Sequence, residues 1–90
     1  MKVIKISALW CPSCLIMNKV VRRVMEDYPQ VDLLELDIDM DMEEVGKYEV
    51  GKILPVIIFL TDSRSEFDRL VGEIDELELR KIVDKYAEVN

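Results

Sequence analysis

The fold follows from residues 3–14, which read VIKISALWCPSC. The stretch begins with β-branched residues typical of a strand and ends in two cysteines three positions apart. Pro12 lies between them, and proline suits the first turn of a helix, where its missing N–H group needs no partner. The sequence therefore predicts a strand over residues 3–8 that leads into a helix carrying both cysteines.

Helical periodicity continues after Pro12 as far as Pro29, which is expected to end this first helix. Apolar residues recur at spacings of three and four, and neighbouring apolar positions widen the same face. The expected buried face comprises Leu15, Ile16, Met17, Val20, Val21, Val24 and Tyr28.

The rest of the chain predicts three more strands and two more helices. Strands are expected over residues 31–38, over the buried run 55–60 and over the edge segment 66–71. A short helix should end near Tyr48, and Asp75 should cap a last helix, with Glu78 at the capping-box position. The order βαβαββα predicts an α/β fold, a four-stranded mixed sheet with three helices on its two faces, in one domain over residues 1–90.

Composition excludes several classes of function. Nineteen acidic residues against twelve basic ones give a net charge of -7, which argues against nucleic-acid binding. The longest apolar run, residues 56–60, is far short of the ~20 residues that span a membrane. The N-terminus lacks the long apolar stretch and small residues of a cleaved signal, so a cytoplasmic location is expected.

Cys11 and Cys14 are the candidate reactive residues that remain after these exclusions. At positions i and i+3 they share one face of a helical turn, close enough to form a disulfide. The helix N-terminus favours a thiolate at Cys11, whereas Cys14 lies deeper beside apolar residues. We expect Cys11 to attack a partner disulfide and Cys14 to release the product, with no bound cofactor.

Two other roles are conceivable for the cysteines, a metal site and a structural disulfide. A metal site needs about four ligands, and with two cysteines and no histidine one could form only across an oligomer. A structural disulfide closing so small a loop would stabilise the chain little and is unusual in the cytoplasm. Redox chemistry is therefore the favoured interpretation.

Residues 10–14, W-C-P-S-C, resemble the W-C-G-P-C active site of the thioredoxin family. The resemblance covers nearly the whole chain, although the family's first strand and helix have no counterpart here. Its further matches are Asp27-Tyr28, Leu54-Pro55 and Val71-Gly72.

The resemblance implies a substrate-binding surface around the cysteines. It implies that Pro55 is cis and faces them, that the main chain of Leu54 pairs with an extended substrate, and that Gly72 admits the substrate backbone. The remaining residues of this surface are Trp10, Pro12 and Ser13. The alternatives are a trans proline at a strand start, a plain turn glycine and a tryptophan packed in the core.

Three departures from the family pattern affect these expectations. The Pro-Ser dipeptide resembles the C-P-Y-C site of glutaredoxins, but a valine before the cis-proline and a Gly-Gly pair are absent. Lys19 replaces a helix-kinking proline, so the first helix should be straight. One extra residue lies between Tyr48 and Pro55, which leaves the presentation of Leu54 open.

A fourth departure concerns charge beneath the site. The family has a buried aspartate six residues before the first cysteine and a lysine on the adjacent strand, whereas this chain has Lys5 and Glu35 there. We hypothesise a reversed ion pair in which Lys5 favours the Cys14 thiolate and biases the couple towards the dithiol. The alternative is that both side chains extend from the sheet edge into solvent.

The function expected from this resemblance is a monomeric protein-disulfide reductase, itself reduced by a flavoprotein similar to thioredoxin reductase. Two alternatives remain open. One is a glutaredoxin-like enzyme reduced by a small thiol, and the other is a non-enzymatic binding module whose cysteines sense redox state.

Overall fold

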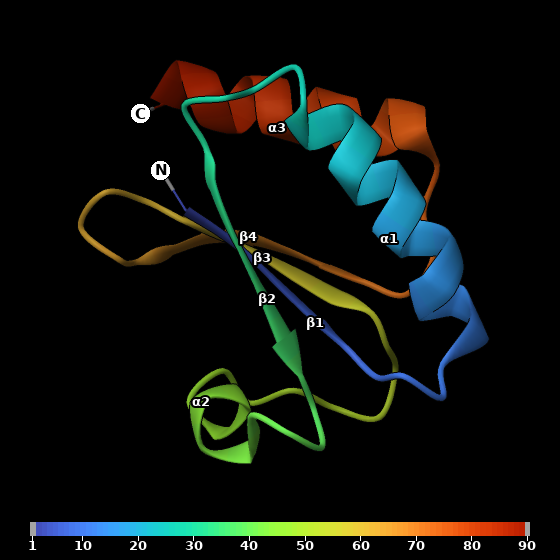
Figure 1. The fold of residues 1–90 in the computed structure, drawn as a ribbon. Helices are drawn as coiled ribbons and strands as arrows, with labels where there is room; N and C mark the ends of the chain where they lie inside the picture. Colours follow the sequence, from blue (N-terminus) through green and yellow to red (C-terminus); the bar gives the residue numbers. More distant parts are fainter. Residues whose placement is uncertain (1, 90) are drawn as a thin grey trace.

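The computed structural model describes residues 2–89, which form four strands and three helices (Figure 1). The order βαβαββα agrees with the sequence prediction. The elements are β1 (Lys2–Ser7), α1 (Pro12–Met25), β2 (Asp32–Asp37), α2 (Met42–Gly46), β3 (Val56–Leu60), β4 (Glu66–Val71) and α3 (Glu76–Val89).

The four strands form one mixed sheet in the order β2-β1-β3-β4. β1 is parallel to β2, whereas β3 is antiparallel to both β1 and β4. All five residues of β3 are buried, as its unbroken apolar run predicts, and the edge strands β2 and β4 carry charged residues. The register places Lys5 opposite Glu35 on β2 and opposite Ile57 on β3.

Helices cover both faces of the sheet, α1 and α3 on one and α2 on the other (Figure 1). Side chains alternate along each strand, so each face has its own buried cluster. The cluster with α1 and α3 includes Val3, Met17, Val21, Val24, Phe59, Leu79, Val83 and Tyr86. The cluster on the α2 side includes Ile4, Ile6, Cys11, Cys14, Leu36, Val45, Leu54 and Ile58.

The expected apolar face of α1 was too wide. Leu15 and Ile16 are 57% and 52% exposed, whereas the sequence pattern predicts that both are buried. Each residue advances about 100° around a helix, so the two positions after buried Cys14 turn away from the sheet. The helix also ends at Met25 rather than near Pro29, and it continues through Lys19 without a break.

Among residues 2–89, no helix combines the length and the apolar character needed to cross a lipid bilayer.

Candidate active site

Cys11 is the residue from which α1 starts. Its backbone is extended, with φ of -96° and ψ of 111°, and Pro12 follows in the first turn of the helix. The Cys11 Sγ accepts a hydrogen bond from the backbone N–H of Cys14 at 3.2 Å, as a capping serine or aspartate would. The nucleophile proposed from sequence therefore serves as the helix cap.

The two cysteines differ in environment. Both are free thiols, Cys11 7% exposed and Cys14 completely buried. Burial raises the pKa of the Cys14 thiol from 9.0 to about 11, and a hydrogen bond to the Cys11 side chain acts in the same direction. A backbone hydrogen bond at Ala8 and the charge of Lys5 lower that pKa by smaller amounts. Cys14 therefore keeps its proton at neutral pH, as expected for a resolving thiol.

The Leu54–Pro55 peptide bond is cis, as the resemblance implied. Leu54 is buried and belongs to the same hydrophobic cluster as both cysteines. The Pro55 carbonyl accepts a hydrogen bond of 2.8 Å from the Gly72 N–H. Gly72 has φ of +88°, and a Cβ there would lie 3.5 Å from the Ile53 side chain, which is an ordinary contact. The positive φ, and not a lack of space, is therefore the reason for glycine at this position.

The segment between Tyr48 and Pro55 is tied to the sheet edge by Arg69 of β4. Its guanidinium donates to the backbone carbonyl of Tyr48 at 2.7 Å and to that of Glu49 at 3.4 Å. Glu49 has a positive φ of 49°, an uncommon conformation for a non-glycine residue. Arg69 therefore holds the backbone turn at Tyr48 and Glu49 against β4.

Trp10 is 65% exposed, which contradicts the core-packing alternative. Its indole Nε1 donates a hydrogen bond of 2.8 Å to the Asp39 carboxylate in the β2–α2 turn. Asp37 and Asp41 build that turn by accepting backbone N–H groups. The sequence marks Asp39 only by its place in an acidic turn after a strand, so its contact with Trp10 was not predicted.

Exposed apolar side chains adjoin every part of this site. Such surfaces usually mark places where another molecule binds. They are Leu9 and Trp10 before the cysteines, Leu15 and Ile16 after them, Ile53 before the cis-proline and Val71 before Gly72.

Lys5 is only 1% exposed, which excludes the alternative that it extends into solvent. Its Nζ lies 3.4 Å from a carboxylate oxygen of Glu35 and donates a hydrogen bond to the Asn18 side-chain oxygen. Burial lowers the pKa of Lys5, and Glu35 opposes that effect. Although burial alone would raise it, the pKa of Glu35 is held below its usual range by Arg22 and Lys5. The reversed ion pair is therefore present, with Lys5 buried and Glu35 partly exposed.

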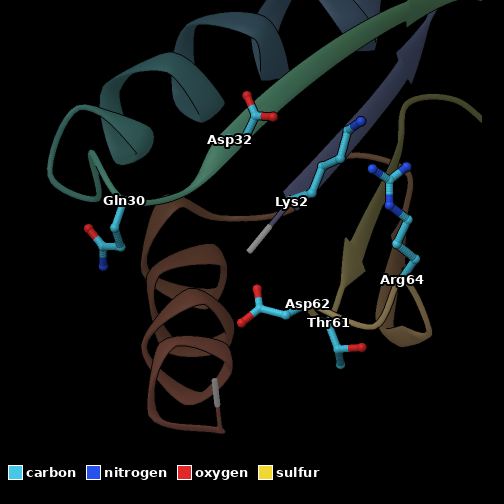
Figure 2. A pocket seen from close by; sticks show the side chains of 6 residues that line it. All are labelled: Lys2, Gln30, Asp32, Thr61, Asp62 and Arg64. Atoms are coloured by element: carbon cyan, nitrogen blue, oxygen red, sulfur yellow. The ribbon is translucent and has the colours of Figure 1, made fainter.

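The surface has hollows towards both ends of β1, and two of them are relevant to the predicted site. One of about 290 Å³ includes Lys5, Asn18, Arg22 and Glu35 in its wall. Another of about 310 Å³ lies at the opposite end of β1, and it contains none of the predicted site residues (Figure 2). Its lining is Lys2, Gln30, Asp32, Thr61, Asp62 and Arg64. Among residues 2–89, no cluster of acids and cysteines is arranged to hold a metal ion.

Comparison with known proteins agrees with this geometry. The family model described as Thioredoxin matches residues 1–85. The thioredoxin of Chlamydia trachomatis is 32% identical over 79 residues, covering 88% of this chain and 76% of that protein. The thioredoxin of Staphylococcus epidermidis is 30% identical over 86 residues, or 94% of this chain and 81% of that one. The crystal structure of Fasciola hepatica thioredoxin has a TM-score of 0.84 at 28% identity, covering 94% of this chain and 79% of that one.

Proposed function

Because the chain belongs to the thioredoxin family and is a thiol–disulfide oxidoreductase, we propose that it reduces disulfides of other proteins through Cys11 and Cys14. One observation carries the assignment to these two residues. The Cys11 sulfur is at the first turn of a helix, where it accepts the Cys14 N–H group, while the Cys14 thiol is completely buried. A helix N-terminus stabilises negative charge on the first sulfur, and burial keeps the second protonated until it is needed.

The reaction proceeds in two exchanges. The Cys11 thiolate attacks one sulfur of the substrate disulfide, and the other substrate sulfur leaves as a thiolate. Cys14 then loses its proton and attacks the Cys11 sulfur, which releases the second substrate thiolate and leaves a Cys11–Cys14 disulfide. Two electrons pass from the cysteine pair to the substrate, so no bound cofactor takes part.

Substrate is positioned, in this proposal, by the backbone on either side of the cysteines. The main chain at Leu54 pairs with an extended substrate segment, and Gly72 leaves room for that segment. Pro12 and Ser13 form the surface between the two cysteines, and Trp10 covers the side nearest α2. The exposed apolar side chains around this surface support binding of unfolded or flexible protein segments.

We assign re-reduction of the cysteine pair to a flavoprotein of the thioredoxin reductase kind, acting on a monomer in the cytoplasm. Family membership supports this partner over glutathione, and so does the absence of the valine and the Gly-Gly pair of glutaredoxins. Coupled turnover with thioredoxin reductase and NADPH, compared with turnover by glutathione and glutathione reductase, separates the two reductants.

The direct test is reduction of insulin disulfides by dithiothreitol with and without the protein. Wild type should accelerate precipitation of the insulin B chain, and Cys11→Ser should abolish the acceleration. Cys14→Ser should instead trap a mixed disulfide between Cys11 and the substrate, visible by mass spectrometry. Acceleration by Cys11→Ser equal to wild type would reject the proposed nucleophile.

A further inference from the structure

Arg69 of β4 links the backbone before the cis-proline to an ion pair at the sheet edge. Its Nε and Nη2 atoms donate hydrogen bonds of 3.0 and 2.8 Å to the two carboxylate oxygens of Glu66. The same Nη2 donates to the Tyr48 carbonyl at 2.7 Å, and Nη1 donates to the Glu49 carbonyl at 3.4 Å. One guanidinium therefore connects the charged edge of the sheet to the turn that follows α2.

The geometry of this guanidinium makes it a firm attachment for the turn. Its side chain is only 25% exposed, and hydrogen bonds from an ionised donor are roughly twice as strong as those between neutral groups. Bidentate pairing with Glu66 fixes the plane of the guanidinium, so the direction of its remaining N–H groups is fixed as well. Lysine has one donor nitrogen on a flexible chain and lacks this fixed geometry.

The turn held by Arg69 opens the segment 49–55, which ends at the cis-proline. The other end of the segment is attached where the Gly72 N–H donates to the Pro55 carbonyl at 2.8 Å. Within the part of the chain that the structure describes, the intervening backbone of residues 50–54 forms no hydrogen bond. The path of this backbone therefore depends on the two attachments and on side-chain packing.

Side-chain packing supports the two ends of the segment better than its middle. Residues 51–53 are exposed, whereas Val50 is half-buried against the cluster that contains Leu54 and both cysteines. Segments with few buried contacts and exposed backbone open locally at little cost in free energy. The attachment to Arg69 should therefore determine how often the segment occupies the arrangement seen in the structure.

We propose that Arg69 is a positioning residue for protein substrates, because it holds the backbone at Leu54 in the arrangement that pairs with an extended segment. This inference rests on the proposed function, in which Leu54 and Gly72 bind the substrate backbone. Arg69 acts through the turn at Tyr48 and Glu49 and takes no part in the two thiol exchanges.

Loss of this attachment should lower the fraction of molecules that are ready to bind a polypeptide. When only a fraction of the molecules can bind, the apparent dissociation constant rises in inverse proportion to that fraction. A small disulfide without a peptide backbone needs no pairing at Leu54, so its reaction with Cys11 should depend little on Arg69. Arg69 would thus favour polypeptide disulfides over small ones.

The test measures single turnovers of the reduced protein with excess insulin and with bis(2-hydroxyethyl) disulfide. Samples are quenched in acid, and mass spectrometry after maleimide labelling counts the free thiols that remain on the chain. The dependence of the rate on insulin concentration gives a half-saturating concentration and a plateau rate. The variants are Arg69→Met and Arg69→Lys. Arg80→Met is the matched control, because Arg80 is 29% exposed and pairs with Glu76 and Asp27 instead of the turn.

Arg69→Met should raise the half-saturating insulin concentration about tenfold, because one hydrogen bond from a charged group shifts an equilibrium by about that factor or more. Its plateau rate, and its rate with the small disulfide, should stay within about twofold of wild type. Arg69→Lys, which keeps the charge, should lie between the two. Trypsin provides a second measurement: cleavage after the exposed Lys52 should be faster in Arg69→Met and unchanged in Arg80→Met.

An unchanged half-saturating concentration in Arg69→Met would overturn the inference, even if trypsin cleaves the variant faster. Equal slowing with insulin and the small disulfide would indicate a disturbed cysteine pair, and the same shift in Arg80→Met would indicate general destabilisation; either result would also overturn it. If Arg69→Met fails to fold, as judged by circular dichroism, Arg69→Lys decides, and its half-saturating concentration must exceed that of wild type by at least about twofold. Failure of the wild-type protein to reduce insulin would reject the proposed function itself, and that result is distinct from any shift among the variants.

Discussion

The buried Cys14 thiol should make the reduced protein lose stability in alkaline solution. Its pKa is about 11 in the folded chain and 9.0 when freely hydrated, so between these values the unfolded chain binds fewer protons at Cys14. Stability falls with pH wherever the unfolded state binds fewer protons. The contribution is complete below pH 9 and is lost as pH rises through about 11.

The magnitude follows from the same two values. One pKa unit corresponds to about 1.4 kcal/mol, so a difference of about two units gives roughly 2.7 kcal/mol of stability that disappears on full ionisation. Other groups titrate in this range: the raised pKa of Tyr86 acts in the same direction and the lowered pKa of Lys5 in the opposite one. Comparison with Cys14→Ala removes the Tyr86 contribution and most of the Lys5 contribution, because burial and Glu35 outweigh Cys14 in setting the pKa of Lys5.

The measurement is urea denaturation followed by circular dichroism at several pH values from about 8 to 11, without oxygen and with a phosphine reductant. Cys14→Ala should be less stable than wild type at the lowest pH, because it loses buried volume. The difference between the two proteins should then shrink by up to about 2.7 kcal/mol as pH rises. A difference constant to within about 0.5 kcal/mol across the range would refute the reasoning.

Three further predictions concern residues outside the cysteine pair. Tyr86→Phe removes a fully buried hydroxyl that bonds the Leu60 carbonyl and the Lys2 backbone, so thermal or urea denaturation should reveal a loss of about 1–3 kcal/mol. Gly72→Ala forces a side chain onto a φ of +88° and should cost about 1–2 kcal/mol in the same assay, with unchanged stability as the contrary result. Asp39→Asn replaces the charged acceptor of the Trp10 indole. It should alter tryptophan fluorescence while changing stability by less than about 1 kcal/mol, and an unaltered spectrum would contradict the hydrogen bond.

Local patterns were enough to predict the architecture. The unbroken apolar run of β3 can be buried on both faces only in the middle of a sheet. The charged residues of β4 can stay in contact with water only at a sheet edge. The exposure of Leu15 and Ile16 was missed because periodicity shows that a helix has an apolar face but not how much of it a neighbour covers. The width of the buried face depends on tertiary packing, which periodicity does not describe.

The site was predictable where its chemistry is local. The two cysteines and Pro12 lie within four residues, so spacing alone placed them on one helical turn. The hydrogen bond between Trp10 and Asp39 joins residues 29 positions apart, and it cannot be predicted from the two residue types. Strand register could suggest that Lys5 and Glu35 are neighbours, but the burial of one and the partial exposure of the other depend on how α1 covers the sheet.

The hydrogen bond from the Cys14 N–H group to the Cys11 sulfur links helix stability to the reduction potential. A helix cap is worth about 0.5–2 kcal/mol, and an ionised acceptor is roughly twice as strong as a neutral one. Oxidation converts the accepting sulfur into a disulfide sulfur, so part of this capping energy is present only in the dithiol form. For a two-electron couple, about 1.4 kcal/mol corresponds to 30 mV, so the cap raises the potential by at most about 40 mV. If Cys11 and Cys14 form the proposed redox couple, the start of α1 makes the protein a milder reductant than the same cysteine pair in an uncapped chain.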